Sequence, residues 1–107
     1  MSQLGLFDVA RGKTETSADA ARKIEDRAQT LREHAFSLIA NYSLIPYYGG
    51  LIADEVAGLM GEDILAIRPR VSELVKMGAI EDTGRRRLNQ RGNSQRVWRR
   101  SPSFKPQ

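Results

Sequence analysis

The chain has 107 residues, of which 40% are hydrophobic, so it can form one small core but not two ordinary domains. It has no cysteine, which excludes disulfides, thiolate metal sites and a cysteine nucleophile. Its apolar runs are short, and its first residues lack the basic and apolar segments of a secretion signal, so we expect no membrane span and a cytoplasmic protein.

The formal net charge of +4 conceals a strong polarity along the chain. Residues 68–107 carry 11 basic and 3 acidic side chains, a net charge of +8, whereas residues 1–67 carry 6 basic and 10 acidic ones, a net charge of −4. A basic surface attracts the phosphate backbone of nucleic acids by releasing counterions, whatever the base sequence. The acidic N-terminal part would disfavour docking in the reverse orientation.

Residues 1–16 show no helical or strand periodicity and are expected to form a flexible arm. The pattern Thr16-x-x-Asp19 resembles a capping box and opens a helical region. Glu25-Asp26 is a candidate break, which would divide this region into helices over about residues 17–24 and 27–41. An apolar stripe recurs along it at alternating steps of four and three: Ile24, Ala28, Leu31, Ala35, Leu38 and Tyr42.

The segment 43–50 (SLIPYYGG) has the proline and the glycine pair of a connecting loop. The next helix has acidic residues in its first turn, then a short apolar face, and it ends at Gly61. These positions are Asp54, Glu55, Val56, Leu59 and Met60. Asp63 can cap a further helix that runs to about Met77 and stops at Gly78. Two helices and a tight turn within about 25 residues have helix-turn-helix spacing.

After Gly78 the pattern becomes extended. Residues 79–82 and 97–100 are predicted to pair as strands around a loop at residues 88–94, giving a two-stranded wing. Residues 101–107 have too few apolar groups to pack and are expected to be disordered. The expected fold is mainly α with a small β-hairpin: a three-helix core plus a wing over residues 17–100, between the arm 1–16 and the tail 101–107.

Projection of residues 63–78 at about 100° per residue separates two faces. The face expected to pack into the core consists of Ile64, Ile67, Val71, Leu74 and Gly78. The opposite face, with Arg68 beside it, consists of Leu65, Pro69, Ser72 and Lys76. In a major groove Arg68 would make a bidentate guanine contact, while Leu65 and Pro69 would touch thymine methyls. Arg70 lies nearer the buried flank, where the alternatives to base contact are an ion pair or a phosphate contact.

Pro69 is unexpected in the middle of a helix, because it lacks the backbone donor and usually bends or breaks the helix. Alternatively, the helix begins near Ala66, and Pro69 then lies in its first turn. The groove-facing surface is similar in both cases.

The predicted wing is dense in arginine. Residues 85–100 include 7 arginines and no acid: Arg85, Arg86, Arg87, Arg91, Arg96, Arg99 and Arg100. A hairpin that contacts only water normally carries both acidic and basic side chains. Contact with phosphates or a minor groove is therefore expected. The candidate residues are Arg85, Arg86, Arg87, Arg91 and Arg96. Trp98 could stack on a base, but a lone tryptophan in a strand is more commonly part of a core.

The segment GLIADEVAGLMGEDILAIRPRVSELVKMGAIEDTGRR resembles the winged helix-turn-helix of MarR-like regulators and small phage-encoded DNA-binding proteins. The matching patterns are E-(V/I)-A-x-x-(L/M)-G and V-x-P-R-x-x-E-L-x-x-x-G-x-I. The resemblance covers roughly residues 27–100 and implies that residues 63–77 are the recognition helix and residues 85–96 the wing. Two features depart from it. Ile52 replaces the usual Thr or Ser cap, and the wing is richer in arginine than a typical regulator's.

Gln3-Leu4-Gly5-Leu6-Phe7 resembles the QLxLF pentapeptide with which bacterial replication and repair proteins bind the DNA polymerase sliding clamp. Leu6 and Phe7 would fill an apolar cleft, and Gln3 would form a hydrogen bond at its edge. Such a flexible segment binds weakly, because ordering it costs entropy. Alternatively, Leu4, Leu6 and Phe7 cover an apolar patch of this domain or of a second copy.

Neither catalysis nor a bound cofactor is expected. His34 is the single histidine, and no second metal-ligating side chain lies at ligand spacing from it. Adjacent acids such as Asp54-Glu55 diverge on a helix and are better suited to capping than to acid/base catalysis. No glycine-rich phosphate loop with a lysine occurs.

The leading hypothesis is a cytoplasmic winged-helix protein that binds double-stranded DNA as a bacterial or phage transcriptional regulator. The alternatives are a replication-associated adaptor that binds the sliding clamp through residues 3–7 while it holds DNA, and a module for protein contact alone. Dimerisation through residues 17–41 would suit a regulator that reads paired half-sites.

Overall fold

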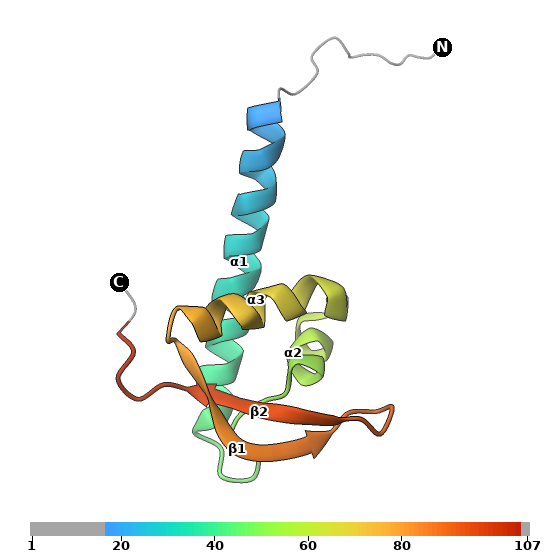
Figure 1. Ribbon diagram of the computed structural model, residues 1–107, viewed down its shortest axis with the longest axis vertical. Helices are drawn as coiled ribbons and strands as arrows, with labels where there is room; N and C mark the ends of the chain where they lie inside the picture. The colour runs from blue at the N-terminus through green and yellow to red at the C-terminus, as the bar shows by residue number, and fades with distance from the viewer. Residues whose placement is uncertain (1–16, 106–107) are drawn as a thin grey trace.

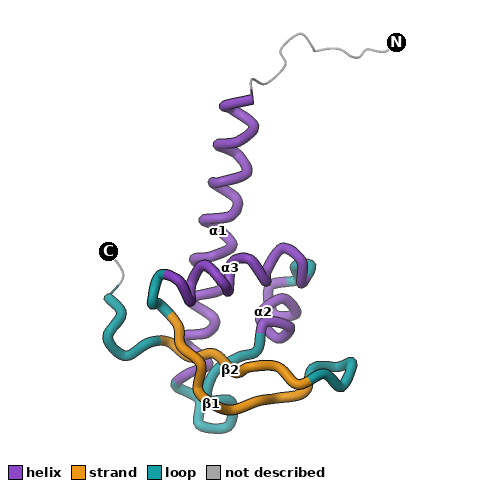
Figure 2. The backbone as a smooth tube through the Cα atoms, in the orientation of Figure 1, coloured by secondary structure: helices purple, strands orange, loops and turns teal. Residues whose placement is uncertain are grey.

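The computed structural model describes residues 17–105, which form three helices followed by a two-stranded antiparallel hairpin (Figures 1 and 2). The elements are α1 (Ser17–Ser43), α2 (Ala53–Met60), α3 (Ile64–Lys76), β1 (Ile80–Leu88) and β2 (Ser94–Arg100). The fold is mainly helical with a small hairpin, as the sequence predicts. The candidate clamp-binding residues Gln3, Leu4, Leu6 and Phe7 lie outside the described part of the chain.

Helix α1 runs without interruption through Glu25 and Asp26, so the predicted break is wrong. Both acids are exposed, and neither a proline nor a glycine is present to end the helix there. Residues 17–27 contribute nothing to the core, and Ile24, the first member of the predicted stripe, is 71% exposed. The N-terminal part of α1 extends past the rest of the molecule (Figure 1).

Helix α2 is capped by a side chain three residues inside it. The residue before the helix, Ile52, has an apolar side chain that is buried, and its backbone N–H donates to Glu55 Oε1 at 3.0 Å. The carboxylate of Glu55 thus forms one half of a capping box, while the apolar side chain of Ile52 cannot accept the N–H groups of the first turn as a Thr or Ser would. Gly61 ends the helix in the left-handed conformation, with φ of 67°.

Helix α3 begins at Ile64 and continues through Pro69, so Pro69 does not lie in its first turn. Asp63 Oδ1 accepts the N–H of Leu65 at 2.8 Å, which is the predicted N-cap. Pro69 and Leu65 are both exposed, so water can bind the Leu65 carbonyl that has lost its donor. The helix ends at Lys76 with Met77 as its C-cap, and Gly78 follows with φ of 76°.

The strands are longer than predicted. Their register runs from Ile80 opposite Arg100 to Leu88 opposite Ser94, with an irregularity between Asp82 and Arg86. The arginine run lacks the apolar alternation that marks a strand, which is why sequence analysis ended the first strand too early. Leu51 pairs with Trp98 through two backbone hydrogen bonds of 3.0 and 2.8 Å, which fastens the hairpin to the loop before α2. Trp98 packs against the core, as expected of a lone tryptophan.

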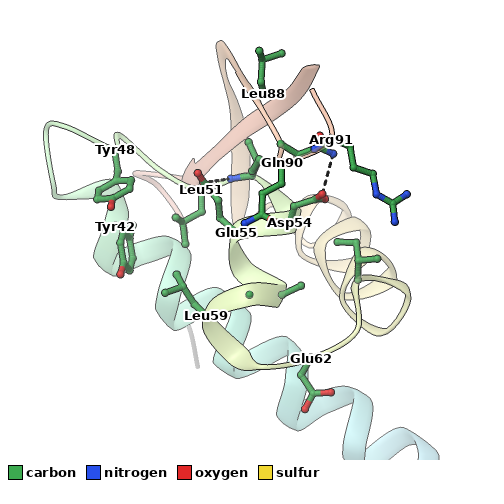
Figure 3. Close-up of a pocket in the computed structure, with 15 residues that line it drawn as sticks. Tyr42, Tyr48, Leu51, Asp54, Glu55, Leu59, Glu62, Leu88, Gln90 and Arg91 are labelled. Atoms are coloured by element: carbon green, nitrogen blue, oxygen red, sulfur yellow. Dashed lines mark hydrogen bonds between the residues drawn. The ribbon is translucent and has the colours of Figure 1, made fainter. Parts of the chain in front are cut away.

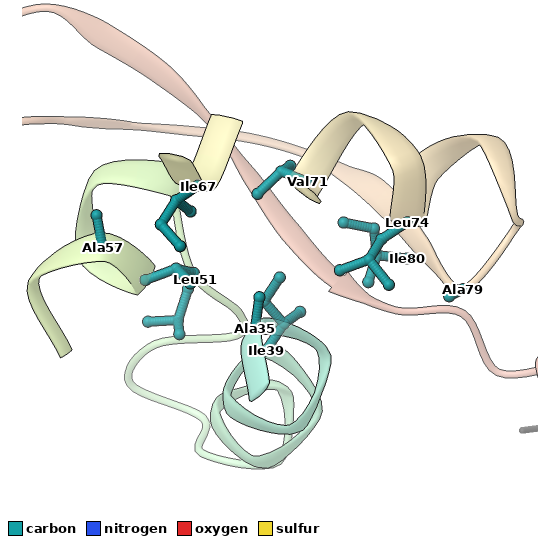
Figure 4. Close-up of a cluster of buried hydrophobic side chains, with 10 residues drawn as sticks. Ala35, Ile39, Leu51, Ala57, Ile67, Val71, Leu74, Ala79 and Ile80 are labelled. Carbon is teal, nitrogen blue, oxygen red and sulfur yellow. The ribbon is translucent and has the colours of Figure 1, made fainter. Parts of the chain in front are cut away.

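The core lies where α3 crosses α1 and where α2 and the start of β1 close the remaining sides (Figure 4). Its largest fully buried side chains include Ile39 of α1, Val56 of α2 and Ile67 of α3. The sequence stripe missed Ile39. Ala28, Leu31 and Ala35 of that stripe are buried as predicted.

Residues 101–105 lie against the body and do not form the loose tail expected from the sequence. Ser101 is buried, and its N–H donates to the carbonyl of Ala79 at 2.9 Å. The ring of Phe104 meets Phe36 of α1 edge-on, with centroids 5.4 Å apart. This aromatic contact and the hydrogen bond of Ser101 hold the otherwise polar segment.

Within residues 17–105, no helix combines the length and apolar character required to cross a membrane.

Gly50 has no room for a side chain. Its φ is 134°, and a Cβ built there would lie 2.1 Å from the carbonyl oxygen of Trp98. We expect Gly50→Ala to lower the free energy of unfolding by at least about 2 kcal/mol, because the bridge between Leu51 and Trp98 would have to open. Gly58→Ala is the matched control. It lies in α2 with nothing within 4 Å of the new Cβ, and should stabilise the protein by up to about 1 kcal/mol. Denaturant unfolding measures both, and equal effects would refute the steric explanation.

Candidate nucleic-acid interface

One face of α3 is buried and the other is exposed, as the helical projection predicts, but Gly78, which was predicted to pack into the core, lies beyond the helix and is exposed. Ile67, Val71 and Leu74 are buried against α1 and α2. The exposed face holds the five side chains that sequence analysis assigned to a groove: Leu65, Arg68, Pro69, Ser72 and Lys76. Leu65 is 72% exposed.

Arg70 is engaged within the fold. Its Nη2 donates to Glu73 Oε2 at 2.8 Å, and Arg32 of α1 donates to Glu73 Oε1 at the same distance. Burial would raise the pKa of Glu73, but the hydrogen bonds and charges of Arg32 and Arg70 outweigh it and hold the pKa below its usual 4.5. Arg70 therefore forms an ion pair, which was one of the alternatives to base contact. The cluster of Arg32, Arg70 and Glu73 joins α3 to α1.

Arg87 was a candidate for nucleic-acid contact, but its guanidinium binds within the fold. Its Nε and Nη2 donate to the two carboxylate oxygens of Glu55, each at 2.9 Å. The same guanidinium donates to the carbonyls of Tyr48 and Gly50 at 3.2 and 3.0 Å. These four bonds leave Arg87 little capacity to bind a ligand, so it is removed from the candidate interface.

Three further arginines of the hairpin have contacts within the fold that occupy part of their side chains. Arg99 forms a close ion pair with Glu81 at 2.6 Å, whereas Arg96 lies 3.6 Å from Asp82, a longer and more exposed contact. Arg100 donates to the carbonyl of Phe104. Of these, Arg96 keeps the most freedom to contact a ligand, so it remains a weaker candidate.

The remaining cations of α3 and the hairpin have no acidic partner within residues 17–105, and all are exposed. They are Arg68, Lys76, Arg85, Arg86 and Arg91, and we call them the free cations. The guanidinium of Arg85 lies against Gly49. Sequence analysis identified all five, but it could not separate them from the paired arginines, because each pairing depends on contacts distant in the sequence.

The loop at the hairpin tip contacts the first turn of α2. Asn89 Nδ2 donates to Asp54 Oδ2 at 2.9 Å. Between the tip and α2 lies a half-open groove of about 630 Å³, whose walls include Tyr48, Leu59 and Arg91 (Figure 3). The carboxylates along this groove are already engaged: Glu55 by Arg87, Asp54 by Asn89, and Glu62 by Arg27.

Within the described part of the chain, no group of three or more acidic or histidine side chains is placed to hold a metal ion. No known family model, curated protein or solved structure matches this chain. Its function must therefore be inferred from the side chains and their geometry.

Replacement of Arg87 tests its structural role. We expect Arg87→Ala to lower the free energy of unfolding by about 1–3 kcal/mol, because it leaves the part-buried Glu55 without its charged partner. Arg86→Ala removes the neighbouring but exposed guanidinium and should change stability by less than about 0.5 kcal/mol. Thermal or denaturant unfolding compares the two. If both variants are as stable as the wild type, the Glu55 contact does not hold the hairpin.

Proposed function

We propose that this chain is a winged helix-turn-helix protein that binds double-stranded DNA and acts as a transcriptional regulator in the cytoplasm of a bacterium, encoded by the bacterium or by a phage. The observation that carries the proposal is the set of free cations on α3 and the hairpin. A fold that forms ion pairs for Arg70, Arg87 and Arg99 leaves these five unpaired and exposed. Unpaired cations on two adjoining elements suit a polyanion that contacts both.

In this proposal α3 enters the major groove. Arg68 donates to the O6 and N7 acceptors of a guanine, and Leu65 contacts a thymine methyl. Ser72 and Lys76 lie further along the same exposed face and contact the phosphate backbone. Pro69 lies on the exposed face, so the carbonyl that it leaves without a backbone donor is not buried in the core.

The hairpin contacts the DNA backbone beside that groove. Arg85, Arg86 and Arg91 are exposed along β1 and its tip, where they can reach phosphates or a minor groove. These contacts would give affinity without base preference, whereas Arg68 would give the preference. The chain would then read sequence with one helix and hold the duplex with the hairpin.

Substitutions at the two kinds of position should differ. Selection from random duplexes gives the preferred sequence, and affinity is then measured against salt concentration. Arg68→Ala should cost about 1–3 kcal/mol of discrimination at one base pair. Arg86→Ala should weaken all duplexes alike and reduce the slope of log K against log salt by about one unit.

Arg99→Ala is the matched control for Arg86→Ala. Arg99 is already paired with Glu81, so its loss should change the salt slope by much less. If the wild-type protein ignores duplexes even at low salt, or if the three variants behave alike, the proposal is wrong.

The sequence Gln3-Leu4-Gly5-Leu6-Phe7 supports a second candidate, an adaptor that holds DNA and binds the DNA polymerase sliding clamp. We expect an adaptor to be captured by immobilised clamp, and the double variant Leu6→Ala, Phe7→Ala to lose capture while it keeps its DNA affinity. Leu44→Ala is a control, because it removes an exposed leucine of the folded domain. No capture of the wild type eliminates the adaptor. A regulator should instead protect a short palindrome in footprinting and scatter light as a homodimer.

A further inference from the structure

The loop at the hairpin tip is organised around Asn89. The amide oxygen of its side chain accepts the backbone N–H groups of Arg91 and Asn93 at 3.0 and 2.9 Å. Its backbone N–H donates to the carbonyl of Asn93, and its carbonyl accepts the N–H of Gly92. The side-chain Nδ2 donates outside the loop, to Asp54 in the first turn of α2. Asn89 therefore closes the loop and fastens it to the body.

The strand just before this loop is fastened to the same turn of α2. Side chains alternate along a strand, so Arg87 and Asn89 lie on the same side of β1. They bind Glu55 and Asp54, which are neighbours at the start of α2. The hairpin is thus held at two alternate positions, Arg87 and Asn89, while Arg86 before them and Leu88 between them are exposed.

Packing alone does not hold the end of the hairpin. Leu88 is 65% exposed, and residues 90–94 are all exposed. An isolated two-stranded hairpin is at best marginally stable in water. The hydrogen bond from Asn89 to Asp54 is the side-chain contact that joins the loop carrying Arg91 to α2. Asp54 and Arg91 lie beside the same groove (Figure 3).

We propose that Asp54 and Asn89 are positioning residues for DNA binding, which hold Arg91 in its binding position before the duplex arrives. This inference rests on the DNA-binding function proposed above. A loop whose backbone is already ordered in the free protein loses less entropy on binding, and the complex is tighter for it. Neither residue needs to touch the DNA.

The chemistry of Asp54 favours this role over one in folding alone. Its Oδ1 is buried and has no hydrogen-bond partner within residues 17–105, which disfavours folding. Its negative charge beside a DNA-binding loop also works against a polyanion. Simple electrostatics therefore predicts that removal of Asp54 tightens binding, whereas the positioning role predicts that it weakens binding.

The experiment measures affinity for a mixed-sequence duplex of about 20 base pairs by fluorescence anisotropy at fixed salt. Asp54→Ala should weaken binding about three- to tenfold, although it removes a negative charge. Asp54→Asn keeps an acceptor for Asn89 and should bind as tightly as the wild type or more tightly. Glu62→Gln removes a carboxylate just beyond the other end of α2, and it should also bind the duplex as tightly as the wild type or more tightly. An Asp54→Ala variant that binds as well as the wild type overturns the inference.

A double-mutant cycle with Arg91 distinguishes a positioning role of Asp54 from a general loss of structure. In the Arg91→Ala background, Asp54→Ala should cause little further loss of affinity, and additive losses would overturn the inference. Backbone ¹⁵N relaxation of the free protein should show residues 90–93 more mobile in Asp54→Ala than in the wild type, with the helices unchanged. If the loop loosens without loss of affinity, the inference fails but the proposed function stands. If the wild type binds no duplex, both fail, and the relaxation data still report whether Asp54 orders the loop.

Discussion

The carboxylate of Glu55 is the group on which the arrangement of this domain depends. Its Oε1 accepts the N–H of Ile52, the residue just before α2. Both of its oxygens accept hydrogen bonds from the guanidinium of Arg87. The same guanidinium reaches the carbonyls of Tyr48 and Gly50 in the loop that precedes α2. One side chain thus specifies where a helix begins and where the hairpin lies. The partly buried pair also satisfies groups that would otherwise be costly to desolvate.

The ion pairs of the fold divide the arginines into two populations. Those that meet a carboxylate hold elements together: Arg70 and Arg32 join α3 to α1, and Arg87 joins β1 to α2. Those that meet none remain on the surface, where their charges add. The net charge of the C-terminal part therefore overstates the potential available to a ligand, because the acids that neutralise it come partly from α2.

Much of the helical part could be predicted from local sequence. The cap at Asp63, the stop at Gly61 and the buried face of α3 each depend on residues within a few positions of one another. The pairing of Arg87 with Glu55 could not be predicted, because the two lie 32 positions apart and an arginine run gives no sign of which member turns inward. The packing of Phe104 on Phe36 is equally non-local. Helix α1 was divided wrongly because two adjacent acids were read as a break, although solvent-exposed acids are ordinary in a helix.

The free-standing start of α1 has a geometric consequence. Residues 17–26 are helical and contribute no buried side chain, whereas Arg27 pairs with Glu62. The projecting part of the helix is therefore about 15 Å long. The chain that precedes Ser17 is joined to the far end of this projecting part, away from α3 and the hairpin (Figure 1). The first turns of α1 therefore stand apart from the surface that α3 and the hairpin form.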